Sequence, residues 1–265
     1  RSRGLGDVYK RQVLMGACNS GSVMTQATGF AYEVVVVMDQ KDWKGPAGAA
    51  IKSELASSVP GLPQAEPSLK ITYVQPKDFT GLLRYVRNIL VVTIDPTAYT
   101  KVSVGYENNV WARGQVVVSL KAPNTESIVE YSKTHEKALV NFFVKVEMNR
   151  AIEQLQKEYS MVVMDNLKSD LNVMLNAPAN FTYYKDTTDF FWSSNNANTG
   201  RMDLIVYTFP YTDPNTFTEE YLVAKRDSVL KANLPGSFPG SYMQTETRAG
   251  VEYTPITLNG KYCGV

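Results

Sequence analysis

Three carboxylates of this chain lie in segments rich in aromatic residues or prolines, and their side chains are the ones best suited to catalysis. Glu66 belongs to a proline-rich segment, and Asp186 and Asp189 flank aromatic runs. A pair of carboxylates beside an aromatic surface is the arrangement with which glycosidases work. The same acids also accept hydrogen bonds from backbone amides in turns, and we favour that interpretation. The hydrolase hypothesis requires the three acids to converge within about 10 Å.

Other catalytic sets lack essential residues. His135 is the only histidine, and it falls in a helical stripe where a structural or solvated role is expected. The two cysteines, Cys18 and Cys263, lie near opposite ends of the chain. These residues complete neither a zinc site nor a Ser-His-Asp triad. Motifs for a nucleophile elbow, a phosphate loop and a calcium loop are absent too. We therefore expect no catalytic residue, no metal site and no cofactor.

A ligand-binding surface is the second chemical hypothesis. Aromatic side chains present large apolar faces for stacking, and Tyr183-Tyr184 and Phe190-Phe191-Trp192 supply several of them. In strands, however, aromatic residues more often form the core or cross-strand pairs, so Trp192 is expected to be mostly buried. The prolines around Gln64 likewise favour a rigid turn. The candidate ligand surface comprises Trp43, Gln64, Glu66, Trp111, Asp189 and Trp192.

Thr187 is a candidate for O-glycosylation. Asp186-Thr187-Thr188 resembles the short acceptor motif of Bacteroidetes proteins, in which an Asp precedes a hydroxyl residue and a methyl-bearing residue. Asp227-Ser228-Val229 has the same pattern but lies in a predicted helix, where a sugar would compete with packing. Because three-residue motifs are frequent by chance, an unmodified Thr187 is the alternative.

The segment Val13-Leu14-Met15-Gly16-Ala17-Cys18 resembles the end of a lipoprotein signal peptide, in which the cysteine thiol receives diacylglycerol. We expect lipidation of Cys18, with residues 13–31 forming the remnant of that signal and a flexible tether to the membrane surface. Residues 1–12 look like a translated sequencing adapter and are interpreted as an artefact. Because no acidic residue lies between Cys18 and Glu33, we expect the anchored protein to face the periplasm.

Charge and hydropathy exclude other partners. Lys and Arg number 27 and Asp and Glu number 26, so the formal net charge is +1. That balance provides no long-range field to attract a phosphate backbone, and nucleic acid is not an expected partner. No stretch approaches the roughly 20 apolar residues of a membrane-spanning helix. The expected contact with a membrane is the lipid anchor alone.

The elements of the first part alternate between strand and helix. A helix is expected from Gly45-Pro46 to about Ser58, because proline suits the first helical position. Asn124 is a good N-cap, and apolar residues at three- and four-residue offsets then predict a long helix to about Leu171 with one break. The expected strands lie at 32–38, 71–74, 89–94, 102–106 and 115–120, with a short helix over 79–86.

The later part has a looser version of the same alternation. Thr218 is expected to cap a helix that Leu234-Pro235-Gly236 ends. Strands are expected near 173–175, 181–184, 190–192, 204–207, 242–243 and 251–253. The sequence therefore predicts an α+β fold with two similar sheet-plus-helix halves, 32–123 and 172–265, joined by a long central helix over 124–171. The second half is expected to be incomplete at its C-terminus.

Short motifs distributed between Val34 and about Tyr262 resemble a family of Bacteroidetes lipoproteins, the domain of unknown function 4837. The matching motifs are Val37-Met38-Asp39 with Trp43 and Gly45, Leu62-Pro63-Gln64 with Glu66-Pro67, Arg87-Asn88-Ile89, Trp111-Ala112 with Gly114-Gln115, Asp189-Phe190 with Trp192, Lys225-Arg226, Leu234-Pro235-Gly236 and Tyr242-Met243. Family members look longer at both ends, which implies truncation here. The resemblance supports the lipoprotein hypothesis and implies no activity.

The leading functional hypothesis is a non-enzymatic lipoprotein of the cell envelope that binds another envelope component, either a protein or a glycan. A carbohydrate-active hydrolase that uses the loop carboxylates is the alternative. A purely structural envelope protein is a third hypothesis, and it predicts that no cleft is present.

Overall fold

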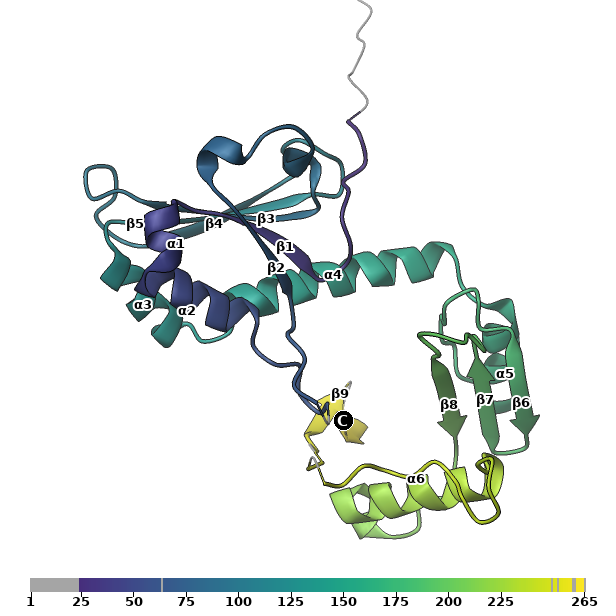
Figure 1. The fold of residues 1–265 in the computed structure, drawn as a ribbon. Helices are drawn as coiled ribbons and strands as arrows, with labels where there is room; N and C mark the ends of the chain where they lie inside the picture. The colour runs from purple at the N-terminus through teal and green to yellow at the C-terminus, as the bar shows by residue number, and fades with distance from the viewer. Residues whose placement is uncertain (1–23, 63, 249, 252, 259–260, 265) are drawn as a thin grey trace, which may run out of the picture.

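The computed structural model describes residues 24–62, 64–248, 250–251, 253–258 and 261–264. Figure 1 shows a first sheet with its helices, a long helix α4 leading away from it, and a second, smaller sheet with helices of its own. The mixture of helices and separate sheets confirms the α+β class. Cys18, and residues 1–12 that were interpreted as a sequencing artefact, lie outside the described residues.

The first sheet has five strands in the order β2-β1-β3-β5-β4. β1 pairs in parallel with β2 and β3, and β3 pairs in parallel with β5. β4 pairs antiparallel with β5 and forms one edge of the sheet. The five strands expected in this part are confirmed within a few residues: β1 Glu33–Val37, β2 Lys70–Val74, β3 Asn88–Ile94, β4 Ser103–Asn108 and β5 Val116–Ala122.

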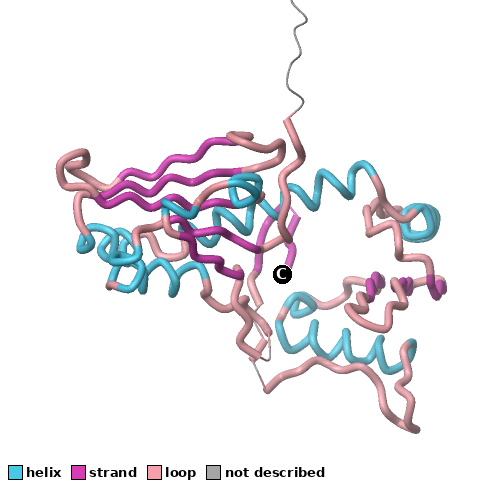
Figure 2. Tube along the Cα trace, turned by 45° about the horizontal axis from the view of Figure 1, so that its top comes forward, coloured by secondary structure: helices cyan, strands magenta, loops and turns pink. Residues whose placement is uncertain are grey.

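Both faces of the first sheet are buried. Val34 and Val36 belong to a core on one face, and Val35 and Val37 belong to a core on the other, because successive side chains of a strand point to opposite faces. Helices cover the first face (Figures 1 and 2), and 3-10 turns cover the second. The covering elements are α1 Gln40–Lys44, α2 Pro46–Leu55, α3 Thr125–Thr134 and α4 Ala138–Lys157 on one side, and η1 Pro76–Asp78 and η2 Gly81–Tyr85 on the other.

The long helix expected over residues 124–171 is three helices, α3, α4 and α5 Met161–Leu171, with two breaks instead of one. At the first break Lys137 adopts the left-handed conformation (φ +60°), and Glu54 Oε1 accepts a hydrogen bond of 2.7 Å from the amide of Leu139. At the second, Glu158 is extended and Ser160 caps α5. Caps and a left-handed residue end helices that the apolar periodicity alone would continue.

The second sheet is an antiparallel meander in the order β6-β7-β8. α5 packs on one face, where Val163 and Leu167 meet Phe191. Thr218 caps α6 as expected, since its hydroxyl accepts a hydrogen bond from the amide of Tyr221 at 3.3 Å. The remaining elements of this part are β6 Tyr183–Thr187, β7 Phe190–Ser194, β8 Asp203–Tyr207, η3 Pro214–Phe217, α6 Glu219–Asn233, β9 Pro255–Leu258 and β10 Lys261–Gly264.

Some expected elements of the later part differ. Residues 173–175 form a loop that follows Asn172, a left-handed residue that ends α5. Tyr242 makes only an isolated bridge to Pro235, and residue 251 is not in a strand. The two halves resemble each other only in that each combines a sheet with helices. Their topologies differ, because the first sheet is mainly parallel and the second is antiparallel throughout.

Helix α4 links the two parts. Its first half is buried at Leu139, Val140, Phe143 and Glu147, whereas most residues from 148 to 157 are exposed. A helix that is exposed on all sides bridges two units instead of lying in one core. Among the described residues, no helix has both the length and the apolar character required to cross a membrane.

Candidate functional site

Two of the three tryptophans proposed for a ligand surface, Trp43 and Trp111, lie on opposite faces of the first sheet. Trp43 stacks on Tyr73 of β2 with ring centroids 4.7 Å apart, and Lys52 Nζ lies 4.1 Å from the centroid of the indole. Trp111 meets Phe79 edge-on at 5.6 Å, in the core of the opposite face. Because the sheet separates them, these two side chains cannot contribute to one platform.

The other proposed ligand residues are also distributed over separate segments. Gln64 and Glu66 are exposed in the loop between α2 and β2, which is closed by a bridge between Ser58 and Pro67. Asp189 is exposed in the β6–β7 turn, where its carbonyl accepts a hydrogen bond from the amide of Thr208 at 2.9 Å. The structure therefore does not bring these residues together with the tryptophans of the first sheet.

Trp192 lies in β7 and is mostly buried, as expected. Its indole N–H donates a hydrogen bond of 3.0 Å to Asp203 Oδ1, and the guanidinium of Arg201 lies 6.0 Å from its ring. The side chains of Phe190 and Phe191, its neighbours in the strand, are fully buried. Trp192 keeps a polar partner, Asp203 of the neighbouring strand β8, because its N–H needs one.

Thr187 is exposed at the end of β6, and its hydroxyl donates a hydrogen bond of 3.2 Å to the carbonyl of Phe190. His135 is exposed at the C-terminal end of α3, where it stacks on Tyr131 at 4.3 Å. In the described part of the chain, no group of three or more His, Cys, Asp or Glu side chains is arranged to hold a metal ion.

An acid pair does form, but with a residue that the sequence did not indicate. Asp186 shares a side-chain hydrogen bond with Asp170 of α5. Burial raises the pKa of Asp186, and the hydrogen bond and charge of Asp170 raise it further, whereas Ser169 and Asp186 lower the pKa of Asp170. Glycosidases separate their two carboxyl groups by about 5 Å or more, and hydrogen-bonded carboxyl groups are closer than that.

A concave surface runs along β4, between this edge strand and helices α3 and α4. It consists of three neighbouring cavities of ≈ 520, ≈ 120 and ≈ 600 Å³. The first two share Tyr131, and the last two share Tyr106 and Phe142. We call this row the β4 groove; the side chains that define it are Val102, Val104, Tyr106 and Asn108 on one side and Glu126, Glu130, Tyr131, Phe142, Lys145, Asn149, Arg150 and Glu153 on the other.

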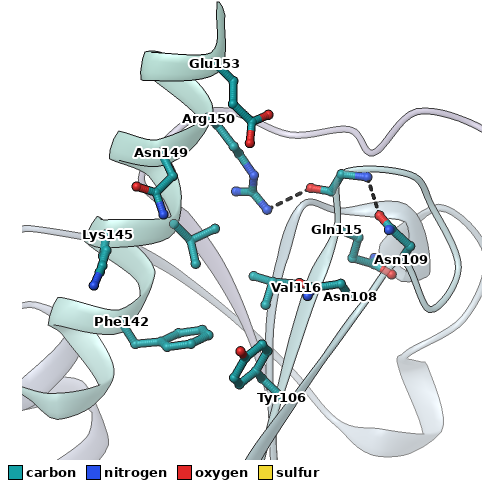
Figure 3. Close-up of a pocket in the computed structure, with 12 residues that line it drawn as sticks. Tyr106, Asn108, Asn109, Gln115, Val116, Phe142, Lys145, Asn149, Arg150 and Glu153 are labelled. Atoms are coloured by element: carbon teal, nitrogen blue, oxygen red, sulfur yellow. Dashed lines mark hydrogen bonds between the residues drawn. The ribbon is translucent and has the colours of Figure 1, made fainter.

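The widest cavity of the β4 groove lies beside α4 (Figure 3). Tyr106 is 60% exposed, and its ring lies 5.1 Å from that of Phe142. Within the described residues, the side chains of Asn108, Lys145 and Asn149 make no hydrogen bond or ion pair. An aromatic face, two free amides and a free ammonium group are therefore available to a ligand.

A buried ionic network supports this end of the groove. Glu147, whose side chain is 2% exposed, accepts contacts from Arg87 at 2.7 Å and from Arg150 at 2.6 Å. Arg150 also donates to Asn88 Oδ1 at 2.8 Å and, as Figure 3 shows, to the carbonyl of Gly114 at 2.8 Å. Burial lowers the pKa of Arg150, and the charge of Glu147 opposes that shift.

Because its two terminal nitrogens are already bonded, Arg150 contributes mainly to the shape and charge of the groove. Gln115 supports the same wall, since its amide group donates to the carbonyls of Arg84 and Val86 at 2.7 and 2.6 Å. No motif in the sequence distinguishes these residues. A usable signal was Glu147, a charged residue four positions after Phe143 on the apolar face of a predicted helix.

Family models divide the chain close to the break between α4 and α5. A model described as a domain of unknown function (DUF8532) matches residues 27–156, and a model described as a domain of unknown function (DUF4837) matches residues 160–265. Residues 160–265 therefore belong to the DUF4837 family. The DUF4837 match covers α5 to β10, so the motifs that suggested this family before residue 156 lie in the part matched by DUF8532 instead.

The β4 groove lies entirely in the DUF8532 part, whereas Thr187, Asp189 and Trp192 lie in the DUF4837 part. A search of curated proteins finds no match, and a search of solved structures finds none either.

Proposed function

We propose that this protein is a non-enzymatic binding module of the cell envelope and that it holds another envelope component in the β4 groove. The observation that supports binding most directly is the widest cavity, where Asn108, Lys145 and Asn149 present side chains with no hydrogen-bond or ion-pair partner in the described structure. Polar side chains without partners lose little when they exchange water for a ligand. The envelope location rests on the lipobox-like segment that ends at Cys18.

Binding suits the groove better than hydrolysis. Among the residues that line the widest cavity, Glu153 is the only carboxylate, so this cavity contains no acid–base pair. Of the three acids considered for hydrolysis, Glu66 lies in a loop of the first part, and Asp186 and Asp189 lie in the second sheet or its turn.

A site-specific photocrosslinker tests whether the groove is occupied. Asn149 is replaced by p-benzoylphenylalanine in the full-length protein, which is then irradiated in its native envelope. Met148 receives the same replacement as a matched control, because it is 53% exposed on α4 and does not line the groove. We expect a crosslinked product from position 149 and none from position 148. Equal products at both positions, or none at 149, would refute the proposal.

The anchor is tested separately. We expect the full-length protein to incorporate labelled fatty acid and to float with membranes, and we expect Cys18→Ser to abolish both. Cys263→Ser is the matched control for the loss of a thiol. A Cys18→Ser protein that still carries the lipid label would exclude Cys18 as the anchor, without affecting the crosslinking result.

A further inference from the structure

β4 is a sheet edge with a free row of backbone groups. It lies at the end of the strand order, and each of its residues from Ser103 to Asn108 is exposed. Its hydrogen bonds to β5 use the backbone groups on one side, and within the described residues no strand pairs with the other side. Such an edge provides alternating N–H and C=O groups to which another strand can bind.

The side chains of this segment divide the groove at regular intervals. Val102 lines the first cavity, Val104 and Tyr106 line the second, and Tyr106 and Asn108 line the third. These residues are two positions apart, which is the repeat of side chains on one face of a strand. An added strand has the same repeat, so alternate side chains of that strand would lie over successive cavities.

The three cavities differ in charge. Glu126 and Glu130 line the first cavity. The second, of ≈ 120 Å³, is lined mainly by apolar and aromatic side chains, including Leu139 and Phe142. In the third, Lys145 and Arg150 outnumber Glu153. The groove therefore changes from acidic to apolar to basic along β4.

We infer that an extended peptide segment of a partner protein adds to β4 as an antiparallel strand, with an acidic residue beside Lys145, apolar residues over the narrow cavity and a basic residue beside Glu126 and Glu130. This inference rests on the proposed function of the groove and names its ligand. The span from Val102 to Asn108 is seven residues, or roughly 20 Å at 3.3 Å per residue. Backbone hydrogen bonds supply affinity in this mode, and the alternate side chains supply specificity.

A second copy of this chain fits the groove less well. If β4 of another copy were the added strand, its groove-facing residues would be Val102, Val104, Tyr106 and Asn108, none of which carries a charge. Such a strand would leave both charged ends of the groove without partners. A glycan lacks the regular series of amide donors that a sheet edge pairs with, so a glycan is the opposing outcome of the test.

The first experiment selects heptapeptides from a random phage-displayed library on the full chain. We expect enriched sequences with a two-residue repeat that place an acidic residue at the N-terminal end, apolar residues in the middle and a basic residue at the C-terminal end. The double variant Lys145→Glu with Glu126→Lys should select the opposite charge order. The control Lys133→Glu with Glu136→Lys makes the same exchange at exposed positions outside the groove and should leave the selection unchanged. No enrichment, or enrichment without the repeat, would refute strand addition.

A second experiment tests the backbone ladder. The best selected peptide is synthesised with N-methyl groups on its odd residues and, separately, on its even residues. Because N–H groups of alternate residues point to opposite sides of a strand, one version should lose at least tenfold in affinity and the other should retain it. Equal binding of both versions would overturn the inference. The crosslink at position 149 would then still support a ligand in the groove, and a glycan in that crosslinked product would identify its class.

Discussion

In β1 of the first sheet, Val34, Val35, Val36 and Val37 are all buried, whereas in β8 of the second sheet residues 204–207 are only partly buried. The inner strands β1, β3 and β5 of the first sheet are covered on both faces, so they contain continuous apolar runs. The second sheet has a single cluster of buried residues, formed with α5. The difference indicates that the first part carries most of the stability and that the second part depends on fewer contacts.

Removing one buried ring from each part tests this difference most strongly. Phe143→Ala and Phe191→Ala each delete a fully buried side chain, and each should cost about 3–5 kcal/mol of unfolding free energy. In urea, hydrogen exchange measured on peptides from both parts should show that each variant loses protection mainly in its own part. Met148→Ala is the matched surface control. If either variant opens both parts equally, the chain is one cooperative unit.

The ionic network beneath the groove should give the next largest effect. Glu147→Gln leaves Arg87 and Arg150 without their buried carboxylate, and we expect a loss of about 2–4 kcal/mol, measured by urea unfolding. Glu153→Gln changes an exposed carboxylate on the same helix and should have an effect of about 0.5 kcal/mol or less. Similar effects for both variants would show that the network contributes little.

The start of α5 tests the second part alone. The hydroxyl of Ser160 accepts a hydrogen bond from the amide of Val163 at 3.3 Å and donates one to the carbonyl of Phe181 at 2.6 Å. Ser160→Ala should cost about 1–2 kcal/mol, with loss of exchange protection confined to α5 and the second sheet. Ser169→Ala, on the exposed side of α5, is the control. Loss of protection in β1 or β3 would contradict the division at the α4–α5 break.

The smallest expected effect is the pH dependence of Glu54 at the start of α4. Burial raises the pKa of Glu54, and the hydrogen bond from the amide of Leu139 partly opposes the shift. Because the pKa of Glu54 is higher in the folded state than in the unfolded state, the stability that protonated Glu54 contributes is fully present below the unfolded pKa of about 4.3. That contribution is lost as pH rises through the folded pKa. Glu54→Gln keeps an oxygen acceptor and should flatten this decline, measured as Tm between pH 4 and 7. An unchanged slope would contradict this assignment.

Local chemistry made many elements predictable. The run of valines before Asp39 indicated a buried strand. Asn124 and Thr218 were predicted as helix caps from their residue types, and in the structure their side chains accept hydrogen bonds from the amides of Ser127 and Tyr221. Prediction was weaker where a single unusual residue decided the outcome. Lys137 in the left-handed conformation divides α3 from α4, and no periodicity of apolar residues reveals such a conformation.

The candidate site was not predictable in the same way. Trp43 and Trp111 were grouped by residue type, and only the pleat of the sheet placed them on opposite faces. The residues that do meet in the groove are widely separated along the chain, and none has a motif of its own. Tyr106 reaches Phe142 because β5 folds back on β4 and the later helix α4 packs beside that edge strand.

The sequence by itself determined the α+β class, the positions of most strands in the first part and the balanced charge, because these depend on composition and on short-range periodicity. Tertiary structure alone decided that β4 is an edge and that Glu147 is buried between Arg87 and Arg150. It also decided that the groove changes from acidic to basic. The physical reason is that strand order and helix packing join residues that are far apart in the chain, where local preferences carry no information about the partner.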